Sequence, residues 1–458
     1  MKPQTLFPED KYAAVVTDLY ELTMAAAYFE TGQDYRATFE LWTRNLPQKR
    51  SCLVCCGLAD AVDYLSGMHF TPDAIDYIRR QESFRHVGDG FFDYLAKFRF
   101  TGDAWAIPEG RVVFAGEPFI RISGPIIEAQ IVETFLLSIF NYQTNIATKA
   151  SRVAAAAGYG GVNRPVVDFG LRRAHGPGAG IHAARAGFIG GCAGTSNVYA
   201  GYRYDIPTYG TAAHSWTMAF DTEMESFREY HRIFPKSTIL LIDTYDVKQG
   251  AVNAAKIGGD LRGVRLDSGD IVAQSKMVRK ILDEAGLKDA KIVASGDLNE
   301  YKISEMLRAG APLDIFGVGT DLVTSRDEPA LQCVYKLVEE EKNGKVIYKI
   351  KLSENKATCP AAKQVFRFSD ADGNFTHDII AKADEEAPDG SEPLLAPVMR
   401  GGKLISPLPS LRESQELARK DLARLPGKYK DFIKAAKYPI TYSDTLKMLL
   451  DKAKRELA

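Results

Sequence analysis

The sequence predicts an α/β protein whose central part is built around a parallel sheet. From Pro165 to about Thr324, short apolar runs are each followed by a stretch with helical spacing, and neighbouring runs lie about 20 to 30 residues apart where they are clearest. The runs are continuously apolar, as expected for strands that helices cover on both faces. A (β/α) barrel and a doubly wound sheet both fit this rhythm.

Five strand candidates define this central part, and polar or glycine residues stand where each of them ends. In both folds that fit the rhythm, ligands bind at the carboxyl ends of the strands. We therefore expect the functional site where these runs end. The five runs are residues 165–170, 238–246, 263–270, 291–297 and 313–320.

The region before this series mixes helix and strand signals. A helical pattern near its start ends at Gly32, a typical helix-ending residue. Strand-like runs follow, and a long helical pattern leads into the central part. The helical patterns cover residues 17–32 and 126–157, and the strand patterns cover residues 37–44 and 102–122.

The region after the series carries hairpin and helix signals. Asn-Gly at 343–344 and Asp-Gly at 372–373 each lie between two strand-like runs, as the turn of a β-hairpin does. A helical tail is predicted from about residue 411 to 457. The chain therefore divides into three predicted regions, 1–125, 126–330 and 331–458.

Composition and charge argue against several classes of protein. Lys and Arg number 58 and Asp and Glu number 59, so the net charge is −1 and no basic excess favours nucleic acid. The most apolar long segment contains Glu128 and Glu133, which disfavours a membrane span. The N-terminus lacks the apolar run of a signal peptide, and only six cysteines occur in 458 residues. We expect a cytoplasmic protein.

Three of the cysteines, Cys52, Cys55 and Cys56, cluster in "SCLVCCGL". A C-x-x-C pattern can serve zinc, but no second Cys/His pair follows at ligand spacing. The run is apolar, and free cysteine is among the most buried residue types. We interpret the three as buried structural thiols.

The first strand end of the series combines an aromatic ring with two cations. Phe169 follows the strand, and Arg172 and Arg173 precede a glycine-rich turn into a helix. A guanidinium binds a carboxylate or phosphate through two parallel hydrogen bonds, and Phe169 can stack on a planar ring. The alternative is a surface loop with solvated arginines and a core phenylalanine.

Three later strand ends carry charged, hydroxyl and glycine residues. "GVRLDSGD" offers Arg265, Asp267 and Asp270, which can hold a ribose or a metal-bound diphosphate, or can pair only with one another. A glycine turn after a late strand can bind phosphate through backbone N–H groups. The loops together describe an anionic planar ring, a ribose and phosphates with a divalent metal, which indicates nucleotide or phosphoribosyl chemistry. The other two ends contribute Ser295, Gly296 and Asp297, and Gly317, Gly319 and Thr320.

The stretch "YGTAAHSWTMAF", residues 209–220, places His214 between a turn and a helix-like segment. A neutral imidazole is a competent nucleophile near pH 7. A histidine beside Ala, Trp and Met is also a common packing residue. Taken alone, the stretch leaves both interpretations open.

Eight segments of the chain together resemble the nicotinate phosphoribosyltransferase family. They occur in the order of that family and lie within residues 17–325, and residues 335–339 and 396–411 also resemble its C-terminal region. The eight segments are "TDLYELTM", "DFGLRRAHGPGAG", "GTSNVYAG", "GTAAHSW", "LIDTYD", "GVRLDSGD", "ASGDLNE" and "FGVGTDLVTS".

The resemblance implies a reaction and a fold. Nicotinate and 5-phosphoribosyl-1-diphosphate would give nicotinate mononucleotide and diphosphate, with coupled ATP hydrolysis and with Mg²⁺ held mainly by the diphosphate. Such an enzyme belongs to NAD biosynthesis and is classified with the ligases. The implied fold is an irregular (β/α) barrel over 126–330 plus an α/β sandwich formed from both chain ends, and the implied assembly is a homodimer with shared active sites.

The resemblance also assigns roles to particular residues. His214 would be phosphorylated by ATP, and Asp267 and Asp297 would meet ribose hydroxyls or the metal-bound diphosphate. Tyr20, with Asp18 nearby, would contact the pyridine ring across the dimer interface. The other implied substrate contacts are Phe169 on the second ring face, Arg172 at the ring and phosphates, Thr211 and Arg265 at nicotinate, Ser295 and Gly296 beside Asp297, and Gly317, Gly319 and Thr320 at the phosphoribosyl phosphate.

Ring specificity depends on Ser196 in "GTSNV". The similar nicotinamide enzymes have an aspartate there, which can accept a hydrogen bond from an amide and would repel a carboxylate. Serine repels neither ring and leaves the carboxylate to Arg265, so we predict a preference for nicotinate. The alternatives are a nicotinamide-using phosphoribosyltransferase and a non-catalytic nucleotide-binding protein on the same scaffold.

Overall fold

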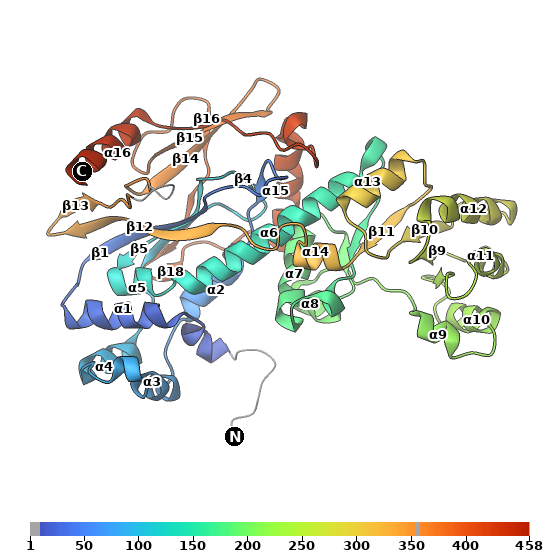
Figure 1. Ribbon diagram of the computed structural model, residues 1–458, viewed down its shortest axis with the longest axis horizontal. Coiled ribbons are helices and arrows are strands. Elements are labelled where there is room, and N and C mark those ends of the chain that lie inside the picture. The colour runs from blue at the N-terminus through green and yellow to red at the C-terminus, as the bar shows by residue number, and fades with distance from the viewer. Residues whose placement is uncertain (1–9, 353–357, 458) are drawn as a thin grey trace. The chain divides into compact units, whose positions relative to one another are not determined.

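The computed structural model describes residues 10–352 and 358–457 of the chain (Figure 1). Two compact units account for these residues. The first unit joins Met1–Asn145 to Ala330–Ala458, and the second is Ile146–Pro329. The first unit therefore contains both ends of the chain.

A seven-stranded antiparallel sheet is the main element of the first unit. Its order is β13-β12-β1-β5-β3-β17-β18, so strands from both sides of the second unit's sequence share one sheet. β1 pairs with β12 on one side and with β5 on the other, and most of its residues are buried. The strands are β1 Arg36–Thr43, β3 Asp103–Ala106, β5 Pro118–Pro125, β12 Cys333–Lys342, β13 Lys345–Tyr348, β17 Ala396–Arg400 and β18 Lys403–Leu404.

The helices of the first unit follow the predicted pattern at its start. The helix expected over 17–32 is α1, and it stops just before Gly32, whose φ of 65° suits glycine. Buried Leu22, Ala25 and Ala26 form its packing face. The remaining early elements are α2 Leu58–Gly67, α3 Pro72–Arg79, α4 Asp89–Lys97 and the strand pair β2 Leu53–Val54 and β4 Val112–Val113, after α1 Leu19–Glu30.

The single helix predicted over 126–157 is wrong in one respect, because two helices occupy these residues. They are α5, Ile126–Gln130, and α6, Glu133–Ala157. At the break, the Thr134 amide donates to a carboxylate oxygen of Glu21 at 2.9 Å. A side chain from α1 thus caps the start of α6, and hydrogen bonding from a distant residue explains a break that the local pattern does not show.

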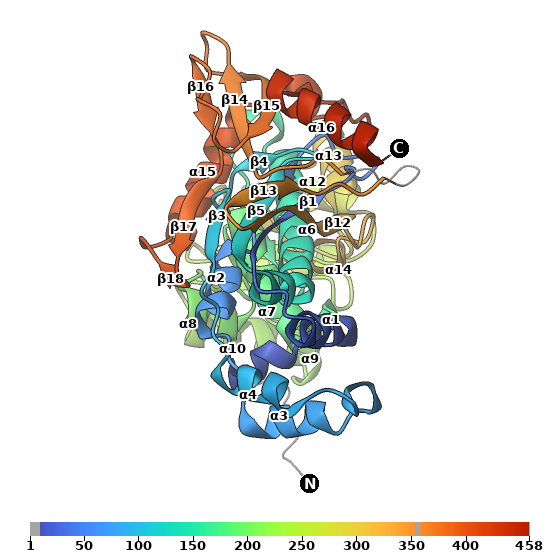
Figure 2. The same cartoon turned by 90° about the vertical axis from the view of Figure 1, so that its left-hand side faces the viewer.

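A smaller four-stranded sheet in the first unit has the order β16-β14-β15-β19. The helix α16 packs against β15, and Figure 2 shows it beside this sheet. The strands are β14 Lys363–Ser369, β15 Phe375–Lys382, β16 Ser391–Pro393 and β19 Ile440–Tyr442, and the helices are α15 Leu411–Arg424 and α16 Asp444–Leu457.

The helical tail predicted over about 411–457 is confirmed at both ends, by α15 and α16, but not between them. α15 ends at Arg424, just before Pro426, whose ring cannot continue a helix. Pro439 and the strand β19 follow, and the Pro439 carbonyl accepts a hydrogen bond from Asp378 of β15. Pairing with β15 therefore replaces helix between α15 and α16.

Both predicted hairpins are confirmed. Asn343 and Gly344 have φ of 51° and 70°, and they join β12 to β13 where Lys342 pairs with Lys345. This is the left-handed backbone that a two-residue hairpin turn requires. Gly373, with φ of 82°, lies in the turn from β14 to β15.

The cysteine cluster of the first unit agrees largely with the predicted burial. Cys55 and Cys56 are fully buried, whereas Cys52 is partly exposed. Burial raises the pKa of the Cys55 thiol well above its ordinary value, and nearby Glu109 acts in the same direction. The Cys55 thiol is therefore a weak nucleophile.

A six-stranded parallel sheet forms the second unit and confirms the predicted parallel sheet. Its order is β7-β6-β11-β10-β9-β8, and every neighbouring pair is parallel. The five predicted runs form β6, β8, β9, β10 and β11, and the two-residue β7 has no predicted counterpart. The strands are β6 Val166–Asp168, β7 Gly194–Thr195, β8 Ile239–Leu241, β9 Gly263–Leu266, β10 Lys291–Ala294 and β11 Ile315–Val318.

Helices alternate with these strands, as Figure 1 shows for α11 to α13. Several polar residues beyond the strand ends are helix caps; Asp270, for example, accepts a hydrogen bond from the Ala273 amide at the start of α12. No helix in the described ranges is both long and apolar enough to cross a membrane. After α6, the helices are α7 Pro177–Ile189, α8 Val198–Tyr204, α9 His214–Met218, α10 Glu223–Ile233, α11 Val247–Ala255, α12 Ile271–Glu284, α13 Glu300–Arg308 and α14 Thr320–Thr324.

Candidate active site

Most of the predicted site residues lie at one edge of the parallel sheet. Parallel strands bring their carboxyl ends to the same edge, so loops distant in sequence meet there. Phe169 follows β6, Asp267 follows β9 and Ser295 follows β10, while Arg265 lies within β9.

Arg265 donates hydrogen bonds to three residues from different segments of the chain. Its Nε donates to the Ser295 hydroxyl at 2.8 Å, Nη1 donates to the Thr211 hydroxyl at 2.7 Å, and Nη2 donates to a carboxylate oxygen of Asp267 at 2.7 Å. Only 9% of Arg265 is exposed. These contacts use three of the five N–H donors of a guanidinium, so two remain for a ligand.

Asp267 is held in its ionised form. Burial alone would raise its pKa, but hydrogen bonds from Ser295, at 2.5 Å, and from Arg265 outweigh burial and lower the pKa below its ordinary value. The nearby His214 imidazole acts on this pKa in the same direction. Asp267 therefore offers a carboxylate, with a negative charge, at neutral pH.

Phe169 and Gly317 form a close pair beside Arg265. The Arg265 guanidinium carbon lies 5.6 Å from the centroid of the Phe169 ring. A Cβ atom at Gly317 would approach the same ring to 2.4 Å, so glycine is required for the ring to lie where it does. The sheet edge thus presents an aromatic face next to a cation, which suits a planar anionic ring.

We expect Gly317→Ala to displace the Phe169 ring and to lower kcat/KM for a substrate with a planar anionic ring by roughly tenfold, because overpacking of this kind costs about 1–3 kcal/mol. Steady-state kinetics checks the prediction. Gly259→Ala is the matched control, since a Cβ atom there meets nothing within 4 Å. Equal kinetic effects of the two substitutions would contradict the role given to the ring.

Asp168 and Ser196 connect the ends of β6 and β7. The Asp168 carboxylate is fully buried and accepts hydrogen bonds from the Gly170 amide at 2.8 Å and the Thr195 hydroxyl at 2.7 Å. The Ser196 amide donates to the Asp168 carbonyl at 2.8 Å. The half-buried Ser196 side chain is thereby fixed beside the loop that carries Phe169.

His214 is the first residue of α9 and is half-buried. Its Nδ1 lies 3.1 Å from the hydroxyl of Thr244, in the loop after β8. When Nδ1 donates to this hydroxyl, the lone pair is on Nε2. The contact orients the imidazole, as required of a residue that reacts.

Asp243 and Thr244 are site residues to which the sequence interpretation gave no role. One carboxylate oxygen of Asp243 accepts hydrogen bonds from the Asp267 amide at 2.9 Å and the Ser268 hydroxyl at 2.8 Å. Its other oxygen is buried without a hydrogen-bond partner in the described part of the chain. The available signal was their position at the end of the apolar run "TILLIDTYD".

The loops after β10 and β11 have backbone conformations that favour glycine or bring two chain segments into contact. Gly296 has φ of 88°, and a Cβ atom there would lie 1.9 Å from the Asp267 carbonyl oxygen. The following Asp297 has φ of 48°, is exposed, and accepts a hydrogen bond from Lys302 through its backbone carbonyl. Gly319 precedes Thr320, the first residue of α14, whose amide has no acceptor within that helix.

Arg172 and Arg173 lie between β6 and α7 with exposed side chains. Within residues 10–352 and 358–457, neither forms an ion pair. Both guanidinium groups are therefore available to an anion.

Asp18 and Tyr20 belong to the first unit and are not part of this cluster. Asp18 precedes α1 and accepts a hydrogen bond from the Thr134 hydroxyl at 3.2 Å, and Tyr20 is 45% exposed. The fully buried Glu21 also accepts a hydrogen bond from the Thr134 hydroxyl, at 2.7 Å. Burial raises the pKa of Glu21 from 4.5 to about 7, although hydrogen bonds from Thr134 oppose the rise.

The raised pKa of Glu21 predicts a pH dependence of stability. Because the folded-state pKa is above the ordinary value, the stabilising contribution of Glu21 is complete below about pH 4.5 and is lost as the pH rises through about 7. We expect the free energy of unfolding of Glu21→Gln to fall less over this window than that of the parent. Urea titrations at several pH values measure this, with exposed Glu82→Gln as control; parallel profiles for parent and Glu21→Gln would refute it.

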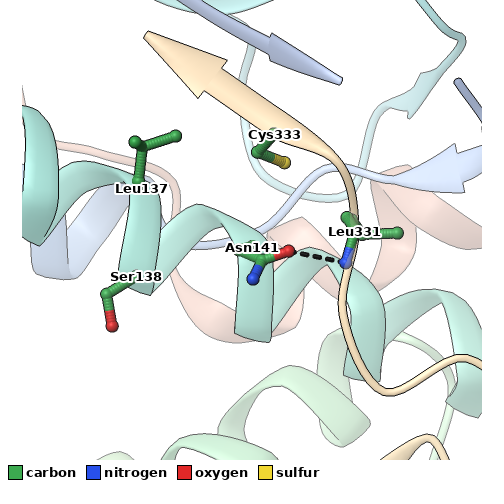
Figure 3. Close-up of a pocket in the computed structure, with 5 residues that line it drawn as sticks. All are labelled: Leu137, Ser138, Asn141, Leu331 and Cys333. Carbon is green, nitrogen blue, oxygen red and sulfur yellow. Dashed lines mark hydrogen bonds between the residues drawn. The ribbon is translucent and has the colours of Figure 1, made fainter. Parts of the chain in front are cut away.

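A separate cavity of about 130 Å³ lies in the first unit (Figure 3). The lining residues are Leu137, Ser138 and Asn141 of α6 and, from the segment beside it, Leu331 and Cys333. Figure 3 shows the Asn141 side chain directed toward Leu331, where its side-chain oxygen accepts a hydrogen bond from the Leu331 amide at 2.7 Å. Burial raises the pKa of Cys333 to about 12 despite a hydrogen bond with Thr43. The cavity contains no charged side chain and none of the predicted site residues.

The sequence is similar to known proteins over most of its length. The sequence matches the nicotinate phosphoribosyltransferase N-terminal domain over residues 15–141, the nicotinate phosphoribosyltransferase family over 165–364 and the C-terminal domain over 390–450. It is 43% identical to a nicotinate phosphoribosyltransferase, pncB2, from Mycobacterium tuberculosis, over 94% of this chain and 92% of that protein.

The chain belongs to the nicotinate phosphoribosyltransferase family. It is also 37% identical to the nicotinate phosphoribosyltransferase of Bacillus subtilis, over 95% of this chain and 94% of that one. The crystal structure of human nicotinic acid phosphoribosyltransferase superimposes with a TM-score of 0.85 and 27% identity, covering 96% of this chain and all of that chain. The family match over 165–364 includes the residues described at the edge of the parallel sheet, such as Phe169, Arg265 and Ser295.

Proposed function

We propose that the chain joins nicotinate to 5-phosphoribosyl-1-diphosphate, releasing diphosphate, and that it couples this step to ATP hydrolysis through His214. Membership in the nicotinate phosphoribosyltransferase family supports the enzyme class and a place in NAD biosynthesis. The observation that carries the proposal is the buried Arg265, held by Ser295, Thr211 and Asp267 beside the Phe169 ring. This arrangement suits a flat ring that bears a carboxylate.

Arg265 would bind the carboxylate with its two remaining N–H donors, while Phe169 packs on the ring. The pyridine nitrogen attacks the anomeric carbon as diphosphate leaves, and it needs no deprotonation at neutral pH. Positive charge develops on the ribose ring, so nearby carboxylates stabilise the transition state. Asp267, ionised by its hydrogen bonds, is the best-placed carboxylate for this role.

Mg²⁺ would be held mainly by the diphosphate, because the described residues include no group of three His, Cys, Asp or Glu side chains that could hold a metal ion. Hard cations prefer oxygen ligands, and the cluster contains the ionised Asp267, the exposed Asp297 and an Asp243 oxygen that lacks a hydrogen-bond partner among the described residues. Bound Mg²⁺ would neutralise charge on the leaving diphosphate. Backbone amides near Gly319 and Thr320, with Gly296 and Arg172, would hold phosphate oxygens.

ATP coupling would proceed through the imidazole of His214. Nε2 attacks the γ-phosphorus of ATP, the bond to the bridging oxygen breaks, and ADP leaves with that electron pair. Thr244 supports this role because it holds Nδ1 and orients the ring. Later hydrolysis of the phosphohistidine returns the free imidazole.

A homodimer with shared active sites would bring Tyr20 and Asp18 to the ring. Support comes from an exposed apolar stripe at the start of the first unit: Val16, Leu19, Tyr20 and Met24 are each at least 39% exposed. Such a stripe favours burial by a partner. The family resemblance assigns that partner as a second copy, in the cytoplasm.

The parallel sheet would be an irregular, open (β/α) barrel within a chain whose two ends form an α/β sandwich. Support comes from the strand order, in which β11 returns to pair with β6 and the remaining neighbours follow the chain. In a closed barrel β7 would pair with β8, and the described strands do not include that pair. The opening would lie between these two strands.

The direct test is turnover. We expect the purified protein to form nicotinate mononucleotide and diphosphate from nicotinate, 5-phosphoribosyl-1-diphosphate and Mg²⁺, and to form more when ATP is added. Product is measured by chromatography. No mononucleotide with or without ATP would refute the proposed function, and faster turnover of nicotinamide than of nicotinate would favour the nicotinamide-using alternative.

Ser196→Asp tests ring selection. A carboxylate beside the bound ring would repel nicotinate, so we expect kcat/KM for nicotinate to fall by roughly tenfold, about 1.4 kcal/mol. Ser196→Asn, which adds similar bulk without charge, is the control. Unchanged nicotinate kinetics in Ser196→Asp would contradict the specificity argument.

A further inference from the structure

A buried cluster of charges lies in the second unit apart from the proposed ligand contacts. The Lys149 ammonium, which is fully buried on α6, lies 2.7 Å from a Glu300 carboxylate oxygen, 2.8 Å from Asp327 and 3.9 Å from Asp321. One turn along α6, Arg152 Nε lies 2.8 Å from the second oxygen of Glu300, which is also fully buried. Two cations from one helix thus hold three carboxylates from other segments.

The positions of two of these carboxylates connect the cluster to the ligand loops. Glu300 is the first residue of α13 and follows Asp297 by three positions. Asp321 is the second residue of α14 and directly follows Thr320. Each carboxylate therefore fixes the start of the helix that follows a proposed phosphoribosyl loop, and each also lies at the favourable end of its helix dipole.

The two loops are also connected to each other. Burial raises the pKa of Asp321, while Lys149 and the nearby Asn299 side chain oppose the rise. Asn299 itself accepts hydrogen bonds from the Tyr301 and Lys302 amides and so caps α13. Asn299 and Asp321 thus link the turn before α13 to the start of α14.

Stability alone is a poor explanation for such a cluster. Desolvation offsets most of the attraction within a buried ion pair, and apolar residues of similar volume often stabilise a core as well or better. A buried cluster of paired charges instead fixes geometry, since its members tolerate few other arrangements. Here the geometry that is fixed is the spacing of two loops at the edge of the sheet.

We propose that Lys149 and Glu300 are positioning residues, which set the distance between the Ser295–Asp297 loop and the Gly317–Thr320 loop for binding of the phosphoribosyl group. The proposal rests on the proposed function. Neither side chain contacts the substrate. Their effect reaches the substrate through Asp321 and through the starts of α13 and α14.

The test compares Lys149→Met with Lys291→Met. Lys291 is the first residue of β10, and its side chain is 54% exposed and pairs with Asp314. We expect Lys149→Met to raise KM for 5-phosphoribosyl-1-diphosphate about tenfold and to leave KM for nicotinate within about twofold. The substitution would disturb the spacing of the two loops that bind the phosphoribosyl group, but not the contacts proposed for the nicotinate ring. Lys291→Met should change neither. Equal effects on both KM values, or none, would overturn the proposal.

Asp321→Asn is the second variant, because it keeps the size of the side chain and removes one charge without leaving Lys149 unpaired. It should raise KM for 5-phosphoribosyl-1-diphosphate in the same selective way, and titration calorimetry with that ligand should show the same loss of affinity. Unchanged affinity in a folded Asp321→Asn protein would overturn the proposal. If the parent protein is active while the variants match it, only this inference fails; if the parent forms no mononucleotide, the proposed function fails first.

Discussion

Arg265→Gln is expected to lower kcat/KM for nicotinate by roughly 100-fold. Two charge-assisted hydrogen bonds to the carboxylate would be lost, and a factor of 100 corresponds to about 2.7 kcal/mol. The same change removes the Nη2 contact that helps to keep Asp267 ionised. Steady-state kinetics with nicotinate as the varied substrate measures the loss.

Two comparisons make the Arg265 result specific. Arg262→Gln changes an exposed arginine just before the same strand and should leave kcat/KM within about twofold. Nicotinamide lacks the carboxylate, so its poorer turnover should fall less than that of nicotinate in Arg265→Gln. If both rings lose the same factor, Arg265 supports the fold of the site and does not recognise the carboxylate.

His214→Ala is expected to abolish the stimulation by ATP and to leave slow, uncoupled synthesis. This variant lacks the proposed nucleophile for phosphoryl transfer but keeps the proposed ring contacts from Arg265 and Phe169. Rates with and without ATP, together with incorporation of label from γ-labelled ATP into protein, provide the measurement.

His231→Ala is the matched control for His214→Ala. Its Nδ1 also lies near a threonine hydroxyl, 3.2 Å from Thr238, but it belongs to the last turn of α10. Label should enter the His231→Ala protein as it enters the parent. If ATP stimulates the His214→Ala protein as much as it stimulates the parent, His214 is not the phosphorylated residue and serves only in packing.

The strands of the second unit could be predicted because burial on both faces requires continuous apolar runs. β10 and β11, which lie inside the sheet, show this most clearly. β7 could not be predicted in this way, since Gly194–Thr195 is too short to form a pattern. The hairpin at Asn343-Gly344 was predictable because the required backbone favours those two residues.

The errors in the fold arise where distant residues determine local structure. The helix over 126–157 breaks where Glu21 caps Thr134, 113 positions away in the sequence. The tail forms β19 because β15 pairs with it. Pro426 and Pro439 could have indicated that the helix is interrupted. The sequence pattern did not indicate that β15 would pair with the residues between the two helices.

In the site, too, single residues could be chosen from the local sequence, whereas their contacts with one another could not be predicted from it. Residue type and position near a strand end made Arg265, Asp267 and Ser295 candidates, and the family resemblance then gave them roles. Their mutual hydrogen bonds depend on the order of strands in the sheet, which the sequence pattern left open. Asp243 was missed because its hydrogen bonds to the Asp267 amide and Ser268 form only when β8 lies beside β9.

A crystal structure with bound nicotinate mononucleotide tests the central claim most directly. We predict that the carboxylate lies within hydrogen-bond distance of the Arg265 guanidinium and that the pyridine ring lies on Phe169 at the carboxyl edge of the parallel sheet. A carboxylate bound instead to Arg172, or a ring bound away from Phe169 with Arg265 still paired only to Asp267, Ser295 and Thr211, would contradict it.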